Sequence, residues 1–162
     1  MASSEEIQDS LKTNPHAVFL ELPEQNLVIY RGRPTEREED ALDYHNVLNV
    51  LHTITGQIDT IRWSGNEYVT NILKGRTEET VSVISCDGGS GGYCYLSVID
   101  LREKKEILCK DLETNFFHFE DYIPEGYKGT CYTRTYDERY GIGFNTAIDY
   151  EGNTIFMEEI DE

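Results

Sequence analysis

The chain has 162 residues, 38% of them hydrophobic, with eleven Tyr and six Phe, which is enough for one folded core and argues against intrinsic disorder. Thirty-one acidic residues against fourteen Lys and Arg leave a net charge of −17 at pH 7. This charge disfavours direct binding to nucleic acid or to an anionic membrane, because repulsion must be overcome before specific contacts form. We expect one α+β domain spanning residues 1–162.

The N-terminus predicts a short helix and no export signal. Ser3 and Ser4 precede two Glu residues, as N-cap residues precede the acids of a first helical turn, and the helix should end near Asn14, before Pro15. The first sixteen residues lack the positive start and apolar run of a secretory signal, and no stretch has the roughly 18 apolar residues of a membrane-spanning helix. We therefore expect a soluble cytoplasmic protein whose four Cys are thiols.

Two strands and a long helix should follow. AVFLEL (17–22) and NLVIYR (26–31) are strand-like, and the spacer PEQ between them is of hairpin length. Residues 34–56 predict the clearest helix, because Thr35 and Glu38 form a capping box and Gly56 is a stop signal. Its apolar residues recur at steps of three and four and form one stripe; they are Leu42, Tyr44, Val47, Leu48, Leu51 and Ile54.

Metal and cofactor sites are not indicated. His45 and His52 lie seven apart on the predicted helix, whereas zinc-binding helices favour a spacing of four. The cysteines have no C-x-x-C spacing. We therefore assign no metal and no cofactor to the chain.

After Gly56 the texture changes to short segments rich in β-branched or aromatic residues. They are QIDTIRW, EYVTNIL, ETVSVISC, YCYLSVIDL, KEILCKD, GTCYTRTY, GIGFNTAIDY and NTIFMEEI, and residues 111–125 are the least regular stretch between them. The predicted fold is α+β: a mostly antiparallel sheet of about eight to ten short strands, one long amphipathic helix packed on it, and the short N-terminal helix.

The glycine-rich stretch SCDGGSGGYC (85–94) predicts a hairpin. It runs from strand to strand, contains no Lys and carries Asp87, so it does not suit a phosphate. Pairing Cys86 with Cys94 aligns Ile84 with Leu96 and Ser82 with Val98, which gathers apolar residues on one face. The loop tip is a candidate contact segment on a rigid scaffold; its residues are Asp87, Gly88, Gly89, Ser90, Gly91 and Gly92.

A second hairpin is predicted at DYEGNT (149–154). The segment alternates oxygen-bearing residues like a calcium loop, but its Gly comes two positions early and no Glu closes it. A β-turn at Glu151 and Gly152 pairs Tyr150 with Asn153, and then aligns Ile148 with Ile155 and Thr146 with Met157.

Catalysis is not indicated by any motif. No G-x-S-x-G is present, no Cys has a catalytic context, and the four His are scattered. We favour a protein that is not an enzyme, with an acid/base pair assembled by folding as the alternative.

Tyrosine and acidic residues suggest a protein-binding surface. In YTRTY, Tyr132, Arg134 and Tyr136 alternate onto one face, and Tyr and Arg are frequent interface anchors. An acidic surface favours a basic partner, although acidity also serves solubility alone. The candidate contacts are Glu36, Glu39, Asp40, Asp43, Glu120, Asp121, Glu125, Tyr132, Arg134, Tyr136, Glu158, Glu159, Asp161 and Glu162.

The favoured function is that of an acidic intracellular inhibitor that occludes a basic protein partner. It would act either as an immunity protein to a toxin or as an antagonist of a nucleic-acid-binding protein through phosphate mimicry. The alternative is a small-molecule-binding protein or enzyme with a Tyr- and Phe-lined pocket in a curved antiparallel sheet. A third possibility is a structural or regulatory subunit whose acidity is incidental.

Overall fold

The computed structural model describes residues 3–15, 17–32, 47–62, 68–86, 94–111, 116–120, 131–137, 142–151 and 153–160. Within them, twelve strands form three antiparallel sheets of four, and each sheet keeps its strands in sequence order. The first sheet contains β1 (Phe19–Leu22), β2 (Leu27–Arg31), β3 (Val47–His52) and β4 (Ile58–Arg62). The second contains β5 (Tyr68–Lys74), β6 (Thr80–Cys86), β7 (Cys94–Asp100) and β8 (Lys105–Asp111). The third contains β9 (Phe116–Glu120), β10 (Cys131–Asp137), β11 (Ile142–Ile148) and β12 (Thr154–Ile160).

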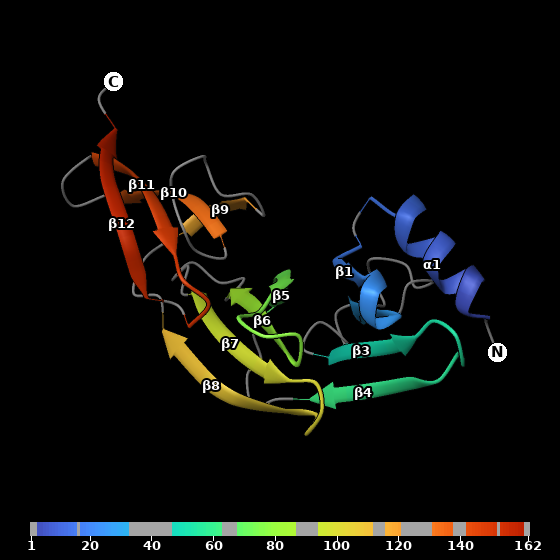
Figure 1. The fold of residues 1–162 in the computed structure, drawn as a ribbon. Coiled ribbons are helices and arrows are strands. Elements are labelled where there is room, and N and C mark those ends of the chain that lie inside the picture. The colour runs from blue at the N-terminus through green and yellow to red at the C-terminus, as the bar shows by residue number, and fades with distance from the viewer. Residues whose placement is uncertain are drawn as a thin grey trace.

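The three sheets follow one another along an arc (Figure 1). In this view the first strand of each sheet, β1, β5 or β9, lies toward the inner side of the arc, and the last strand, β4, β8 or β12, lies toward the outer side. Four-stranded meanders repeated in this way are the blades of β-propellers. In strand order and arrangement, the three sheets therefore resemble successive propeller blades.

Helix α1 (Ser4–Thr13) covers one face of the first sheet. Ser3 is its N-cap, because the Ser3 hydroxyl accepts a hydrogen bond of 3.2 Å from the backbone N–H of Glu6. Ile7 and Leu11 lie one turn apart and are buried against three residues of the sheet: Val28, Tyr30 and Leu51. The predicted N-terminal helix is confirmed, including its end before Asn14.

The opposite face of the first sheet packs on the second sheet. Their shared apolar core takes Leu22, Ile29, Leu48, Val50 and Ile61 from the first sheet and Val69, Ile72, Val81, Val83 and Ile99 from the second. A bulge in β5 at Thr70 places Val69 and Ile72 on the same side, although they are three residues apart. Beside this core, Arg31 donates a hydrogen bond of 2.7 Å to the Val69 carbonyl.

The third sheet meets the other face of the second sheet. Ile148, at the end of β11, is 1% exposed and lies in a cluster with residues of β5, β6 and β7: Leu73, Ile84, Cys94 and Leu96. The order along the arc is therefore α1, first sheet, second sheet and third sheet, with apolar residues buried at each junction.

Most predicted strands are confirmed. β1 and β2 pair antiparallel around a short 3-10 turn at Pro23–Gln25, as the PEQ spacing indicated. The glycine-rich hairpin has the predicted register, with Cys86 opposite Cys94, Ile84 opposite Leu96 and Ser82 opposite Val98. In the terminal hairpin, Thr146 pairs with Met157 as predicted.

The predicted long helix is wrong. Residues 47–52 form strand β3, a turn follows, and the only described α-helix is α1; residues 33–46 lie outside the described part of the chain. β3 is buried on both faces, with Val47 and Leu51 on one side and Leu48 and Val50 on the other. A strand buried on both faces loses its alternation, and its apolar residues then imitate a helical stripe. The α+β class with a helix packed on one sheet is corrected to stacked antiparallel sheets with one terminal helix.

Two further predictions fail where the register shifts. β9 was missed within the irregular stretch 111–125, and its pairing with β10 skips Phe117. In the terminal hairpin Ile148 pairs with Thr154 rather than Ile155, because the register shifts after Ala147. With β3 and β9 included, the described strands number twelve instead of eight to ten.

Cysteine chemistry also differs from the expectation of thiols throughout. Cys94 is disulfide-bonded and 1% exposed, and the residue opposite it in the register is Cys86. Cys109 is an exposed thiol on β8. Among the described residues, no helix combines the length and apolar character needed to span a membrane.

The two readings of residues 47–54 make different predictions for alanine substitutions. In the structure Leu51 is fully buried and Ile54 is 78% exposed, whereas a helix would place both on one buried stripe. Leu51→Ala should lower the free energy of unfolding by about 2–5 kcal/mol, and Ile54→Ala by less than about 0.5 kcal/mol. Guanidinium unfolding of both variants measures these losses in free energy of unfolding, and equal losses would support the predicted helix over strand β3.

The disulfide of Cys94 gives a second prediction. We expect it to join Cys94 to Cys86 and so to close the loop between β6 and β7. Closing a loop of this length should stabilise the fold by about 2–3 kcal/mol, which reduction or Cys94→Ser would remove. Peptide mapping under non-reducing conditions identifies the partner, and unfolding with and without reductant measures the stabilisation.

Candidate functional site

The predicted partner-binding residues divide into two groups. One group, with the glycine-rich loop Asp87–Gly92, lies outside the described residues: Glu36, Glu39, Asp40, Asp43, Asp121, Glu125, Asp161 and Glu162. The other group belongs to the third sheet: Glu120 on β9, Tyr132, Arg134 and Tyr136 on β10, and Glu158 and Glu159 on β12.

The register of the third sheet brings five of these six onto one face. Tyr132 is opposite Glu120, and Arg134 lies between His118 of β9 and Asn145 of β11. Asn145 is in turn opposite Glu158, so a row of His, Arg, Asn and Glu crosses all four strands. Because residues alternate between the faces of a strand, Tyr132, Arg134 and Tyr136 share this face. We call it the Tyr–Arg face; its members are His118, Glu120, Tyr132, Arg134, Tyr136, Gly143, Asn145, Ala147, Phe156, Glu158 and Ile160.

The Tyr–Arg face is the side of the third sheet opposite Ile148. On β11, Asn145 and Ala147 alternate with Thr146 and Ile148, and Ile148 is buried against the second sheet. Glu159 is opposite Phe144, so it belongs to the Ile148 side and not to the Tyr–Arg face. Adjacent acids of β12 are thereby separated between the two faces.

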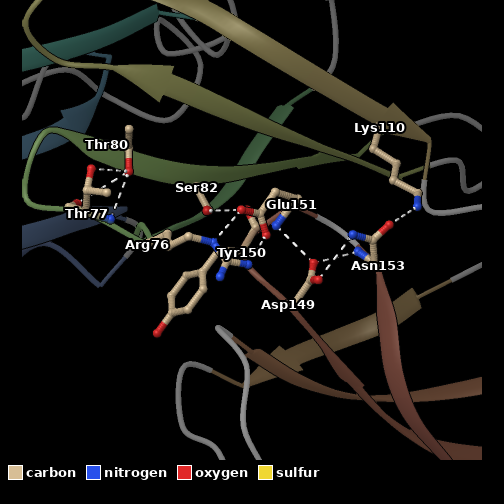
Figure 2. Close-up of polar contacts among 9 residues, drawn as sticks. All are labelled: Arg76, Thr77, Thr80, Ser82, Lys110, Asp149, Tyr150, Glu151 and Asn153. Carbon is tan, nitrogen blue, oxygen red and sulfur yellow. Dashed lines mark hydrogen bonds and ion pairs between the residues drawn. The ribbon is translucent and has the colours of Figure 1, made fainter.

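A polar cluster joins the second and third sheets (Figure 2). Arg76, in the turn between β5 and β6, donates two hydrogen bonds of 2.6 and 2.5 Å to the carboxylate of Glu151. The Arg76 guanidinium also lies 5.5 Å from the centre of the Tyr150 ring. The hydrogen bonds from Arg76 lower the pKa of Glu151, against an opposing effect of burial, and Glu151 raises the pKa of Arg76. Both side chains are therefore charged near neutral pH.

The turn that carries Tyr150 is held by Asp149. One Asp149 oxygen accepts hydrogen bonds from the backbone N–H groups of Glu151, at 3.0 Å, and Asn153, at 2.8 Å. Burial raises the pKa of Asp149, but these hydrogen bonds and that of the Asn153 side chain outweigh it, so the net shift is downward. Ser82 of β6 donates to the Tyr150 carbonyl at 3.0 Å. The Asp149 carboxylate therefore organises a five-residue turn, where the sequence predicted a two-residue turn.

Two hollows flank the turn between β5 and β6. This turn requires Gly75, because a Cβ at this position would lie 2.5 Å from the Thr80 carbonyl oxygen. One hollow, of about 260 Å³, lies between this turn and the Pro23–Gln25 turn, and the residues that line it include Lys74 and Glu78. The other, of about 250 Å³, lies between this turn, β7 and β8, and the Tyr150 turn. Arg76 borders both hollows.

A second polar cluster joins the first and second sheets. Asp59 of β4 contacts His52 Nε2 at 2.9 Å and Lys104 Nζ at 3.2 Å, and its side chain is 15% exposed. The His52 side chain is 39% exposed. The described side chains contain no group of three or more His, Cys, Asp or Glu placed to share a metal ion.

Sequence reasoning missed Arg76, Tyr150 and Asp59 as organising residues. Arg76 and Glu151 are 75 positions apart, and the turn predicted at Glu151 does not indicate Arg76 as its partner. The only local signal was the Asp149–Asn153 spacing, which is also that of a turn closed by a side-chain carboxylate.

The Asp59 cluster predicts that the stability of the fold falls at acid pH. The hydrogen bond from His52, opposed by burial and supported by Lys104, lowers the pKa of Asp59 in the folded state. Asp59 therefore adds stability that is present above its unfolded pKa of about 3.9 and is lost as pH falls through the folded value. The stability difference between the native chain and Asp59→Asn should shrink between about pH 5 and pH 2 in urea unfolding. A difference independent of pH would contradict this assignment.

No protein-family model matches the chain, and no curated protein matches it significantly. Function is therefore inferred from the residues themselves: from the Tyr–Arg face and from the hollows beside Arg76.

Proposed function

We propose that this chain is an acidic binding protein that occludes a basic protein partner, and that the Tyr–Arg face is its docking surface. The observation that carries the proposal is the register of the third sheet, which gathers Glu120, Tyr132, Arg134, Tyr136 and Glu158 on one face. Tyrosine and arginine supply large contact area with polar tips, which is the composition of interface anchors. The carboxylates at the edge strands supply charge for a cationic partner.

Net charge supports the same choice of partner. At −17, the chain attracts positively charged proteins over a distance set by ionic strength and repels anionic surfaces. Such steering accelerates encounter, while the aromatic residues slow dissociation once docked. Inhibition follows from occlusion of the partner. The partner is either a toxin, with this chain as its immunity protein, or a nucleic-acid-binding protein, with the carboxylates of this chain in place of the nucleic-acid phosphates.

We propose the cytoplasm as the place of this activity. Disulfides are uncommon in reducing compartments. The oxidation state of Cys94 in cells therefore bears directly on this part of the proposal.

A second candidate is a small-molecule-binding protein, favoured by the hollow of about 250 Å³ beside Tyr150. The hollow is smaller than the roughly 300–1,000 Å³ of sites for drug-sized ligands. The described residues that line it include no histidine, and its carboxylate, Glu151, is engaged by Arg76. A binding partner therefore accounts for more of the described features than an enzyme does.

The neighbours Glu158 and Glu159 give a matched test of the docking face. Capture from native lysate at low salt should isolate a cationic partner, and its association rate with the purified chain should fall as NaCl is raised. Glu158→Lys should weaken binding by about tenfold or more, because it reverses a charge on the docking face.

Glu159→Lys is the control, since it changes the net charge equally from the opposite face of the sheet. It should slow association through the lost charge but leave the dissociation rate nearly unchanged. A salt-independent association rate would count against steering. Equal dissociation rates for the two variants would remove the Tyr–Arg face as the docking surface.

A further inference from the structure

The hollow beside Tyr150 is an apolar site with two exposed walls. Val98 of β7, Ile107 and Leu108 of β8, and Tyr150 form its apolar lining, and the Arg76–Glu151 pair borders it. Ile107 is 53% exposed and Leu108 is 39% exposed. The other large hydrophobic residues exposed in the described part of the chain, Ile54 and Ile58, lie at the β3–β4 hairpin. Exposed apolar surface of this kind marks contact sites more often than isolated residues do.

A bulge in β8 explains why two adjacent residues line the same hollow. Leu108 pairs with Val98 and Glu106 pairs with Ile99, so Ile107 is the extra residue between them. Neighbours on a regular strand would face opposite sides of the sheet. Bulges re-aim side chains in this way and are frequent beside binding sites.

The wall opposite β8 is fixed before anything binds. The Tyr150 carbonyl is held by Ser82, and the Arg76 guanidinium lies over the Tyr150 ring (Figure 2). Asp149 closes the turn from the other side. A preformed hollow spares the ordering cost that a flexible site would incur on binding.

The described charges beside the hollow are balanced locally. Arg76 pairs with Glu151 through both guanidinium hydrogen bonds, and the turn closed by the Asp149 carboxylate also receives Lys110, which donates to Asn153. The preference for a cationic neighbour therefore comes from the charge of the whole chain. The chain as a whole carries −17. Besides the Arg76–Glu151 pair, the described lining offers only the hydroxyls of Thr77, Thr80 and Tyr150, so the inserted group should be neutral while its neighbours are positive.

We propose that this hollow receives one aromatic or branched aliphatic side chain, flanked by lysine or arginine, from the basic partner. The identity of the partner rests on the proposed function, but the hollow is separate from the Tyr–Arg face. It adds a buried apolar anchor to the aromatic and charged contacts of the Tyr–Arg face. A volume of about 250 Å³ suits one such side chain.

The proposal is tested with short peptides on the full chain. The probes are a pentapeptide with tryptophan between two pairs of lysine, the same peptide with alanine in place of tryptophan, and the tryptophan peptide with glutamate in place of lysine. Methyl resonances of Val98, Ile107 and Leu108 report binding in NMR titrations. The lysine–tryptophan peptide should shift them and bind about tenfold more tightly than either relative.

Two exposed residues provide matched variants. Leu108 and Ile58 are each 39% exposed, and only Leu108 lines the hollow. Leu108→Arg should abolish the peptide-induced shifts at Val98, whereas Ile58→Arg, with the same added charge, should retain them. Ile107→Ser is a milder second variant and should weaken the lysine–tryptophan peptide several-fold.

The outcomes separate this proposal from the docking function. Equal binding of the lysine and glutamate peptides, or binding of free indole with no gain from flanking lysines, would overturn the basic-partner occupant and point to a small neutral ligand. If Leu108→Arg leaves the affinity of the captured partner unchanged while Glu158→Lys weakens it, the proposal for the hollow is wrong and the Tyr–Arg face remains supported as the docking surface. Loss in both variants supports both.

Discussion

The fold depends on burial of sheet faces against one another. The first and second sheets share ten buried apolar residues, and Ile29, Leu48, Val69, Val81, Val83 and Ile99 are fully inaccessible to solvent. Each such side chain contributes roughly 1.5–3 kcal/mol on burial, so this junction outweighs any single polar contact. The polar clusters at Asp59 and Arg76 lie at these junctions, where apolar burial brings adjacent sheets together.

Local pattern predicted most strands because they are short, rich in β-branched or aromatic residues and bounded by turn signals. The β6–β7 hairpin is the clearest case: pairing Cys86 with Cys94 gathered apolar residues on one face, and the structure has this register. The method failed where the apolar pattern imitated a helix or where the register shifted. β3 is buried on both faces and imitates a helix, while bulges displace Phe117 and Ile155 from simple pairing. A short window of sequence does not show that the second sheet will cover one face of β3, and this long-range packing is what favours a strand there.

The site was only partly visible in the sequence for a related reason. Alternation placed Tyr132, Arg134 and Tyr136 on one face, but their neighbours Glu120 and Glu158 come from strands at the two edges of the sheet. The Arg76–Glu151 pair joins a turn of the second sheet to a turn of the third. Such pairs are set by how sheets stack, which is decided by apolar burial far from the charged residues. Charged contacts are therefore consequences of the arc and leave little trace in local composition.

Helix α1 has an effect beyond its contribution to the core. Sheets that stack through their faces risk stacking between molecules, and head-to-tail stacking has no natural end and produces filaments. With Ile7 and Leu11 seated on Val28, Tyr30 and Leu51, the first sheet cannot receive the third sheet of another copy unless the helix is displaced. With the helix in place, the described sheet face left open to another copy is the Tyr–Arg face of the third sheet. Two such faces paired about a two-fold axis form a closed dimer instead of a filament.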